Sequence, residues 1–184
     1  MIYENLIKTN KDQFLAKVRN ICQLLNINPD WLMAVMYKES AGTFRPDIQN
    51  TKFPFKNKDG SIIGYATGLI QFTPGTAAFL GTTTQALKSM SNVQQLDYVY
   101  KYFKGWTGKI KSYSDLYLVT FLPIAVGKPD DWILQTKTLR PDIIAKYNPG
   151  IDLNKDGKIT VAEFREYSMR NLTTAVQEIL KKKM

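Results

Sequence analysis

The chain of 184 residues predicts a mainly α-helical fold with one small β-hairpin. Several segments repeat apolar residues at intervals of three and four, which places them on one face of a helix. Many of these segments follow an asparagine, serine or threonine, the residue types that cap helix N-termini. One Asp-Gly pair lies between two apolar runs, a pattern typical of a tight hairpin turn.

The first two helices are predicted on either side of a short turn. Residues 10–26 keep the helical period of apolar positions. Asn28 is then predicted to cap the next helix, and Pro29 to take its first position. The missing N–H of proline costs nothing there, because that N–H has no partner within the helix. Gly42 suits the end of this second helix, because glycine readily adopts the left-handed conformation found there.

A hairpin and a third helix follow. Residues 53–65 contain the Asp59-Gly60 turn between apolar runs and predict two short strands. Thr73 followed by Pro74 predicts another capped helix, which ends at Gly81.

The rest of the chain is also predicted to be helical. Ser91 caps a helix over residues 92–104. A further helix over residues 116–122 stops before Pro123, because proline lacks the N–H that continues a helix. The last predicted helix runs over residues 161–182.

Composition excludes several kinds of chemistry. The chain has no histidine, so Ser-His-Asp and Cys-His nucleophilic sites and His-ligated zinc sites are excluded. Cys22 is the single cysteine and can form no disulfide within the chain. It keeps the helical spacing of Val18 and Leu25, which favours a place in the core over a catalytic thiol.

Charge and hydropathy limit the partners. The formal net charge of +9 favours a polyanionic partner: nucleic acid, an anionic membrane, or a cell wall bearing teichoic acid or lipopolysaccharide. No nucleic-acid-binding motif is present, which argues against nucleic acid. There is no apolar run long enough for a transmembrane segment and no secretory signal at the start. We therefore expect a monomer made in the cytoplasm without a signal peptide.

Glu39 is the strongest candidate for catalysis. It closes the helix that begins at Pro29 and shares a helical face with Leu32, Val35 and Met36. An apolar surrounding favours the protonated form of a carboxyl group, and a protonated acid can donate to the leaving oxygen of a glycosidic bond. On the helix pattern alone, a glutamate that reaches out to water is an equal alternative.

The residues after this helix carry a family resemblance. Glu39-Ser40 at a helix end, followed by Gly68-Leu69-Ile70-Gln71-Phe72, resembles the soluble lytic transglycosylase and goose-type lysozyme superfamily. Within this superfamily, the chain is similar to phage-encoded cell-wall hydrolases. The resemblance covers residues 27–127. It implies a lysozyme-like catalytic domain, expected over residues 1–140. It also implies a protein that acts at the bacterial cell wall after release from the host, or that is carried in a virion.

The resemblance implies a set of site residues around a single catalytic acid. Glu39 would be that acid, Ser40 would help to orient it, and Gln71 would offer its amide to the substrate. The third family motif, Ala-Tyr-Asn, is absent, and residues 117–123 stand in its place. The substrate contacts expected on this basis are Ser40, Gly68, Leu69, Gln71, Phe72, Tyr117 and Phe121.

The implied reaction cleaves the β-1,4 bond between N-acetylmuramic acid and N-acetylglucosamine in peptidoglycan, with no cofactor. Glu39 would act first as acid and then as base. The oxocarbenium-like sugar needs stabilisation. A second carboxylate could come from Asp47, Asp97 or Asp115, but each is better interpreted as a surface or capping residue. In the family pattern, the substrate's own N-acetyl group stabilises the sugar instead. Attack by the muramoyl 6-hydroxyl would give a 1,6-anhydro end and attack by water a lysozyme product, and the sequence leaves both open.

A second motif lies near the C-terminus, in the segment expected over residues 141–184. Residues 152–163 match the EF-hand calcium loop, in which oxygen ligands alternate along the chain and a glycine makes the sharp turn. The predicted ligands are Asp152, Asn154, Asp156, the backbone carbonyl of Lys158, and Glu163, with Thr160 direct or through water. A structural calcium ion that fixes the following helix is favoured over a metal-free set of Asx turns.

Two functions therefore compete. The first is a peptidoglycan-degrading glycosidase, a phage endolysin or virion-associated lysin. The second is an inactive, calcium-stabilised wall-binding or virion structural module. Both predict binding to peptidoglycan and to anionic wall or outer-membrane polymers, and they differ in whether Glu39 performs chemistry.

Overall fold

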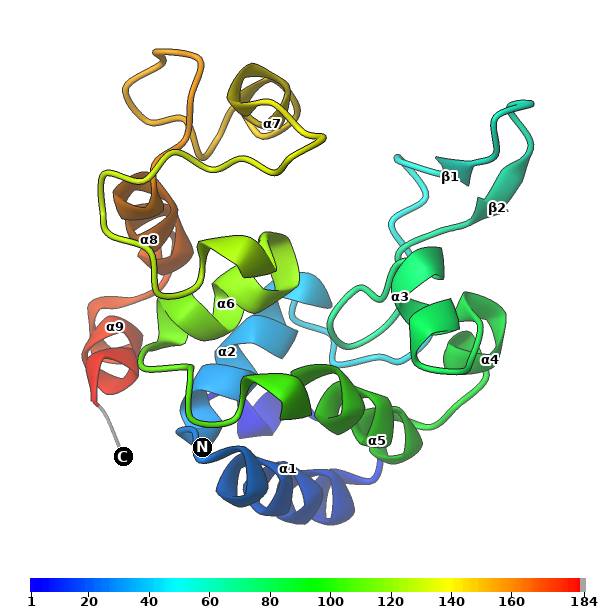
Figure 1. The fold of residues 1–184 in the computed structure, drawn as a ribbon. Helices are drawn as coiled ribbons and strands as arrows, with labels where there is room; N and C mark the ends of the chain where they lie inside the picture. Colours follow the sequence, from blue (N-terminus) through cyan, green and yellow to red (C-terminus); the bar gives the residue numbers. More distant parts are fainter. Residues whose placement is uncertain (183–184) are drawn as a thin grey trace. The chain divides into compact units, whose positions relative to one another are not determined.

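The computed structural model describes residues 1–182, so the last two residues of the predicted C-terminal segment lie outside it. The described chain contains nine α-helices and one two-stranded antiparallel sheet, which confirms the mainly α class (Figure 1). It divides into two compact units, Met1–Gly108 and the part from Lys109 onward. No helix among residues 1–182 has both the length and the apolar character needed to cross a bilayer.

Five α-helices build the first unit. They are α1 (Lys11–Leu25), α2 (Pro29–Glu39), α3 (Pro74–Phe79), α4 (Thr84–Lys88) and α5 (Asn92–Phe103). Short 3-10 turns add η1 (Glu4–Leu6) and η2 (Lys104–Trp106). The predicted helices at α1, α2, α3 and α5 are confirmed, and α4 was not predicted.

The core of this unit lies where α1 packs against α2 and α5. Its fully buried side chains include Phe14, Val18, Leu32, Val35, Leu96 and Val99. Cys22 belongs to the same core and is wholly buried, and burial raises the pKa of its thiol to about 12. The expected core role of Cys22 is therefore confirmed.

Local capping explains where the helices begin. The Asn28 side chain accepts a hydrogen bond from the Asp30 backbone N–H at 2.9 Å, with Pro29 at the first position of α2. Ser91 and Gln94 form a reciprocal capping box at the start of α5. Each bond satisfies an N–H that has no partner within its helix.

The predicted hairpin is confirmed. Strands β1 (Phe55–Lys56) and β2 (Ile62–Gly64) pair antiparallel, with Lys56 opposite Ile62. Within the turn, the Asp59 carboxylate accepts hydrogen bonds from the backbone N–H of Ser61 at 2.9 Å and from its hydroxyl at 2.6 Å. In Figure 1 the two strands project beyond α3 and α4 of the same unit.

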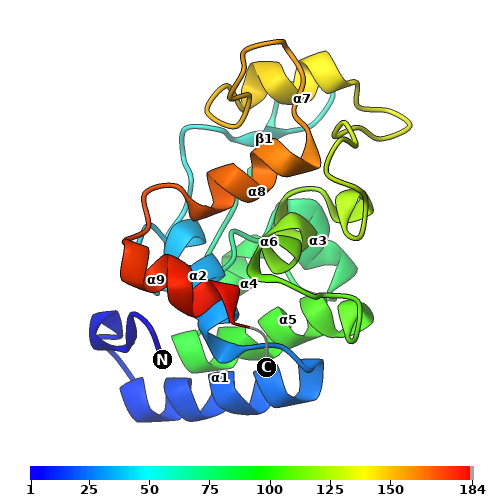
Figure 2. The ribbon, with the colours of Figure 1, turned by 90° about the vertical axis from the view of Figure 1, so that its left-hand side faces the viewer.

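The second unit contains the remaining helices. They are α6 (Tyr113–Phe121), η3 (Pro123–Ala125), α7 (Pro141–Tyr147), α8 (Val161–Met169) and α9 (Thr174–Lys181). The long last helix predicted over residues 161–182 is wrong, because the chain breaks between α8 and α9 (Figure 2). Asn171 takes a left-handed conformation at φ 62° and the Thr173 side chain caps α9, so a new helix starts there.

The division between units differs from the predicted boundary after residue 140. The segment from Lys109 packs with the C-terminal helices: α6 contacts α8, and the Ser114 and Ser168 hydroxyls are hydrogen-bonded at 2.8 Å. The backbone near Ile133 also pairs with that near Thr160. These contacts join residues far apart in the sequence, which local patterns do not reveal.

Candidate active site

Glu39 lies at the last position of α2, half-buried on the wall of a cleft in the first unit. The cleft has a volume of about 340 Å³. Its lining residues are Lys38, Glu39, Ala41, Ile48, Gln49, Asn50 and Gln71. Glu39 is thus neither fully buried nor fully exposed, and it shares the cleft with Gln71 of the predicted motif.

The turn after Glu39 is fixed by Ser40 and Gly42. The Ser40 hydroxyl accepts a hydrogen bond from the Phe44 backbone N–H at 2.9 Å, and Ser40 is fully buried. Gly42, at φ 75°, donates its N–H to the Tyr37 carbonyl at 2.7 Å. The expectation that Ser40 contacts substrate is therefore corrected: it holds the turn that follows Glu39 from beneath the cleft.

The other wall comes from the loop that contains the Gly-Leu-Ile-Gln-Phe segment. Thr67 and Phe72 exchange backbone hydrogen bonds of 3.0 and 2.9 Å, which closes residues 68–71 into a tight turn. The Gly68 N–H donates to the Ile48 carbonyl at 2.8 Å and so joins this turn to the chain beside the cleft. Gln71, at φ 52°, donates its amide to the Gly68 carbonyl at 3.1 Å.

Of the predicted contacts in this loop, only Gln71 lines the cleft. Leu69 is 0% and Phe72 2% exposed, so both are packing residues, which corrects the prediction that they contact substrate. Gly68 is also buried, and its role differs from the expected close approach to a sugar. A Cβ at Gly68 would lie 2.2 Å from Oε1 of Gln95, so the close approach there is to a buried amide.

Gln95 is the residue that sequence reasoning missed. It lies on α5, is 0% exposed, and accepts a hydrogen bond from the Leu69 N–H at 2.7 Å. Its amide nitrogen donates to the Pro46 carbonyl at 3.0 Å and to the Leu87 carbonyl at 2.9 Å. One buried side chain thus ties two loop segments and α4 to α5, with both ends of its amide satisfied.

Charge and burial perturb two groups near Glu39. Burial lowers the pKa of Lys38 to about 8, and the charge of Glu39 acts in the opposite direction. Burial raises the pKa of Tyr102 to about 12, and the Glu39 charge adds to this rise. The Tyr102 ring meets Phe72 edge to face, with ring centroids 6.3 Å apart. Tyr102, which the sequence did not single out, thus lies within the electrostatic reach of the acid.

The candidate second carboxylates are engaged elsewhere. Arg45 donates two hydrogen bonds to Asp47, of 2.9 and 2.7 Å, and these lower the Asp47 pKa. Asp97 pairs with Lys17 at 2.7 Å, and Asp115 accepts the Lys111 N–H at 3.0 Å. Asp47 and Asp97 are surface residues, as expected. Asp115 is instead buried in the second unit, in the first turn of the helix that Ser112 caps and 3.8 Å from the Arg165 guanidinium, which corrects its interpretation as a surface or capping residue.

Tyr117 and Phe121 belong to the second unit. Both rings pack against Phe164 of α8, with centroid distances of 5.4 and 5.0 Å. Tyr117 is buried and also contacts the ring of Tyr113. Tyr117 is therefore a core aromatic of this unit, and Phe121 is half-buried on the wall of a pocket formed with residues of α7. Neither lines the cleft that contains Glu39.

The calcium-like loop folds through its own side chains. The Asp156 N–H donates to the Asn154 side-chain oxygen, and the Lys158 N–H donates to Asp156, each at 2.9 Å. The Gly157 N–H donates to Oδ2 of Asp152 at 3.0 Å, whereas Oδ1 of Asp152 is buried without a hydrogen-bond partner among the described residues.

Glu163 closes the loop at its far end. One carboxylate oxygen accepts from the Leu153 N–H at 3.1 Å, and the other accepts from the Thr160 N–H and hydroxyl at 2.8 Å. In this arrangement, no three acidic, cysteine or histidine side chains within residues 1–182 converge as a metal site. Glu163 would therefore have to turn from Thr160 to reach a metal ion.

Comparisons of the chain with known protein families, with curated proteins and with solved structures gave no match. The family resemblance therefore remains a prediction from the motifs around Glu39 and Gln71.

Gly68→Ala should destabilise the protein more than Gly60→Ala. Both glycines have positive φ, 83° and 86°. Replacing either with alanine would therefore cost about 1–2 kcal/mol in backbone strain. Only at Gly68 would the new Cβ collide with Gln95, whereas nothing lies within 4 Å at Gly60. Urea unfolding of both variants measures the difference. Equal losses in the free energy of unfolding would contradict the Gln95 contact.

Lys38 should make stability rise with pH above neutrality. Its pKa is about 8 in the folded protein against an ordinary value of 10.5. Between these values the unfolded chain holds the proton that the folded chain has released, so raising the pH favours the folded state. The free energy of unfolding of the native protein minus that of Lys38→Met should therefore increase from about pH 8 to 10. A flat difference would show that Lys38 is fully hydrated.

Proposed function

We propose that the protein is a peptidoglycan glycosidase of the lytic transglycosylase or lysozyme type. Its substrate would be the β-1,4 bond between N-acetylmuramic acid and N-acetylglucosamine. The observation that carries the proposal is the position of Glu39 on the wall of a cleft of about 340 Å³ that amide side chains also line. A saccharide offers hydroxyl and N-acetyl groups that amides bind through both donors and acceptors.

In the proposed reaction, Glu39 donates its proton to the leaving glycosidic oxygen. The developing positive charge on the sugar would be met by the substrate's own N-acetyl oxygen, since Asp47 and Asp97 are paired with basic side chains. The carboxylate formed at Glu39 then removes a proton from the attacking hydroxyl. That hydroxyl belongs to the muramoyl 6-position in a transglycosylase or to water in a lysozyme.

The amide side chains of the cleft would have different roles in binding the saccharide. Gln71 has its amide nitrogen directed to the Gly68 and Ile48 carbonyls, so its amide oxygen is the atom suited to accept from a sugar. Asn50 is exposed on the same cleft and offers a second amide. Gln49 is held by Thr67 and Lys88 and shapes the wall.

Glu39→Gln should abolish the clearing of peptidoglycan suspensions while the protein keeps its fold. A catalytic proton donor contributes at least about 100-fold to the rate, and glutamine cannot replace it. Glu178→Gln, at an exposed glutamate of α9, is the matched control and should clear at the native rate. If the native protein clears no peptidoglycan, the inactive wall-binding module replaces the enzyme. If Glu39→Gln remains active, another group is the acid.

We also propose that the loop of residues 152–163 binds one structural calcium ion. Asp152, Asn154, Asp156, Glu163 and the Lys158 carbonyl would hold it, with Thr160 direct or through water. The supporting observation is Oδ1 of Asp152, a buried carboxylate oxygen that lacks a hydrogen-bond partner among the described residues. Backbone pairing of Leu134 with Ile159, at 2.7 Å, already fixes the middle of the loop.

Calcium should raise the melting temperature, and chelation should lower it. At a free concentration 100 times the dissociation constant, one bound ion stabilises the fold by about 2.7 kcal/mol. Asp152→Asn should remove the shift, because the amide still accepts from Gly157 but brings no charge to the ion. Asp142→Asn, at an exposed residue of α7, should keep the shift. Calorimetry of the native protein that shows no calcium-dependent shift would overturn the site.

A further inference from the structure

The hairpin finger, residues 51–64, exposes apolar side chains that the rest of its unit does not cover. Phe53 is 68%, Ile62 54% and Ile63 48% exposed, and Phe55 is exposed as well. These are four of the nine large apolar side chains found exposed within residues 1–182. Such a concentration is unusual, because exposed apolar side chains are ordinarily scattered over a protein surface.

The finger exposes both of its faces. Ile62 and Ile63 are consecutive in β2, so their side chains point to opposite sides of the strand, and both are about half exposed. A hairpin that only extended the fold would bury one face. Insertion into a fluid apolar layer would bury the side chains on both faces of the hairpin. Docking against one flat surface would bury only one face.

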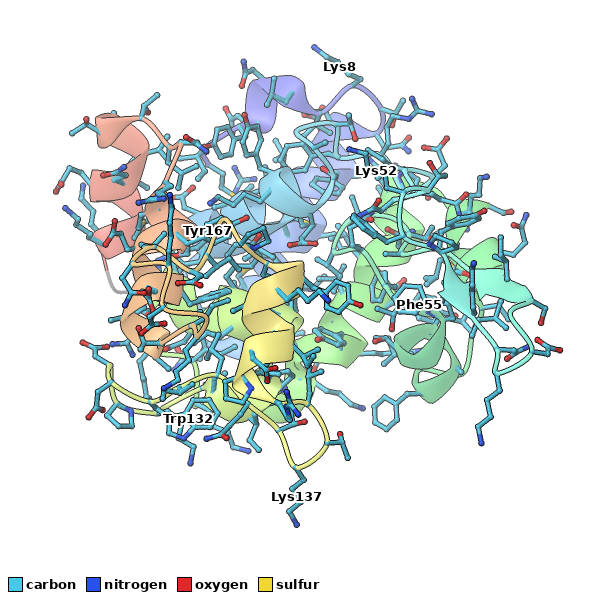
Figure 3. All side chains as sticks on the ribbon, turned by 90° about the horizontal axis from the view of Figure 1, so that it is seen from above. Lys8, Lys52, Phe55, Trp132, Lys137 and Tyr167 are labelled. Carbon is cyan, nitrogen blue, oxygen red and sulfur yellow. The ribbon has the colours of Figure 1, made fainter. Side chains whose placement is uncertain are left out.

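Lysines are interspersed with these apolar residues along the finger. Lys52, Lys56 and Lys58 are all exposed on the finger, against a single acidic residue, Asp59. Figure 3 labels Lys52 and Phe55 of this part of the chain. Hydrogen bonds from Ser61 lower the pKa of Asp59, so this residue stays charged and the finger carries a net charge of three minus one, or +2.

We propose that the hairpin finger inserts into the surface of an anionic phospholipid bilayer. Phe53, Phe55, Ile62 and Ile63 would enter the boundary between headgroups and acyl chains, and the three lysines would contact the anionic headgroups. A second copy of the chain fits less well, because two fingers of charge +2 on molecules of charge +9 repel each other. The inference is independent of the proposed glycosidase reaction.

Vesicle sedimentation tests the apolar contribution. The protein of 184 residues should pellet with vesicles of phosphatidylglycerol and phosphatidylethanolamine, and only weakly with phosphatidylcholine alone. Phe53→Ser combined with Ile63→Ser should lower the affinity at least about tenfold, because the inserted surface is lost. Leu24→Ser, at a residue of α1 that is 53% exposed, is the control and should bind as the native protein does.

A pair of triple variants separates the finger from the overall charge. Lys52→Gln, Lys56→Gln and Lys58→Gln together should lower the affinity for anionic vesicles about tenfold or more. Lys11→Gln, Lys137→Gln and Lys146→Gln change the net charge equally at exposed sites outside the finger and should have a much smaller effect. Thermal melting followed by circular dichroism confirms that each variant is folded.

Three results would overturn the proposal. They are no binding of the native protein to anionic vesicles, equal losses in the two triple variants, and unchanged vesicle binding after Phe53→Ser with Ile63→Ser. If that double variant keeps vesicle binding but loses binding to isolated peptidoglycan, the finger is assigned to the glycan instead.

Discussion

The buried amide of Gln95 is the interaction on which the candidate site depends. Its three hydrogen bonds fix the chain at Pro46, Leu69 and Leu87; the bonds to Leu69 and Leu87 are buried and the bond to Pro46 is partly buried. Removing the amide would take from the buried Leu69 N–H its bond to Gln95, and a buried donor without a partner costs about 1–3 kcal/mol. Because Gly68 is directly beside Gln95, the turn that presents Gln71 and the chain that presents Gln49 and Asn50 are held by the same contact.

Many elements of the first unit could be predicted because the sequence patterns that specify them are local. The Asn28-Pro29 cap, the Ser91 capping box and the Asp59-Gly60 turn each specify an element within a few residues of the signal. The position of Glu39 at the end of α2 could be predicted on the same basis, because Asn28 and Pro29 set the start of this helix and Gly42 lies just beyond its end.

The contacts that join distant segments could not be predicted. Gln95 has the pattern of an ordinary polar position on an amphipathic helix, and only the fold shows that loops cover it. Leu69 and Phe72 carry the motif but serve as packing beneath it. The break before Thr173 was missed because residues 161–182 keep an apolar period across it, while Asn171 adopts a conformation that ends α8.

The central claim is that a cleft built on Gln95 presents Glu39 to a glycan strand as an acid. Mass spectrometry of the fragments released from purified peptidoglycan tests it most directly. The account predicts new ends on N-acetylmuramic acid, either 1,6-anhydro or reducing, and none of them from the Glu39→Gln protein. New ends on N-acetylglucosamine, cleavage confined to the peptide stems, or no released fragments would contradict it.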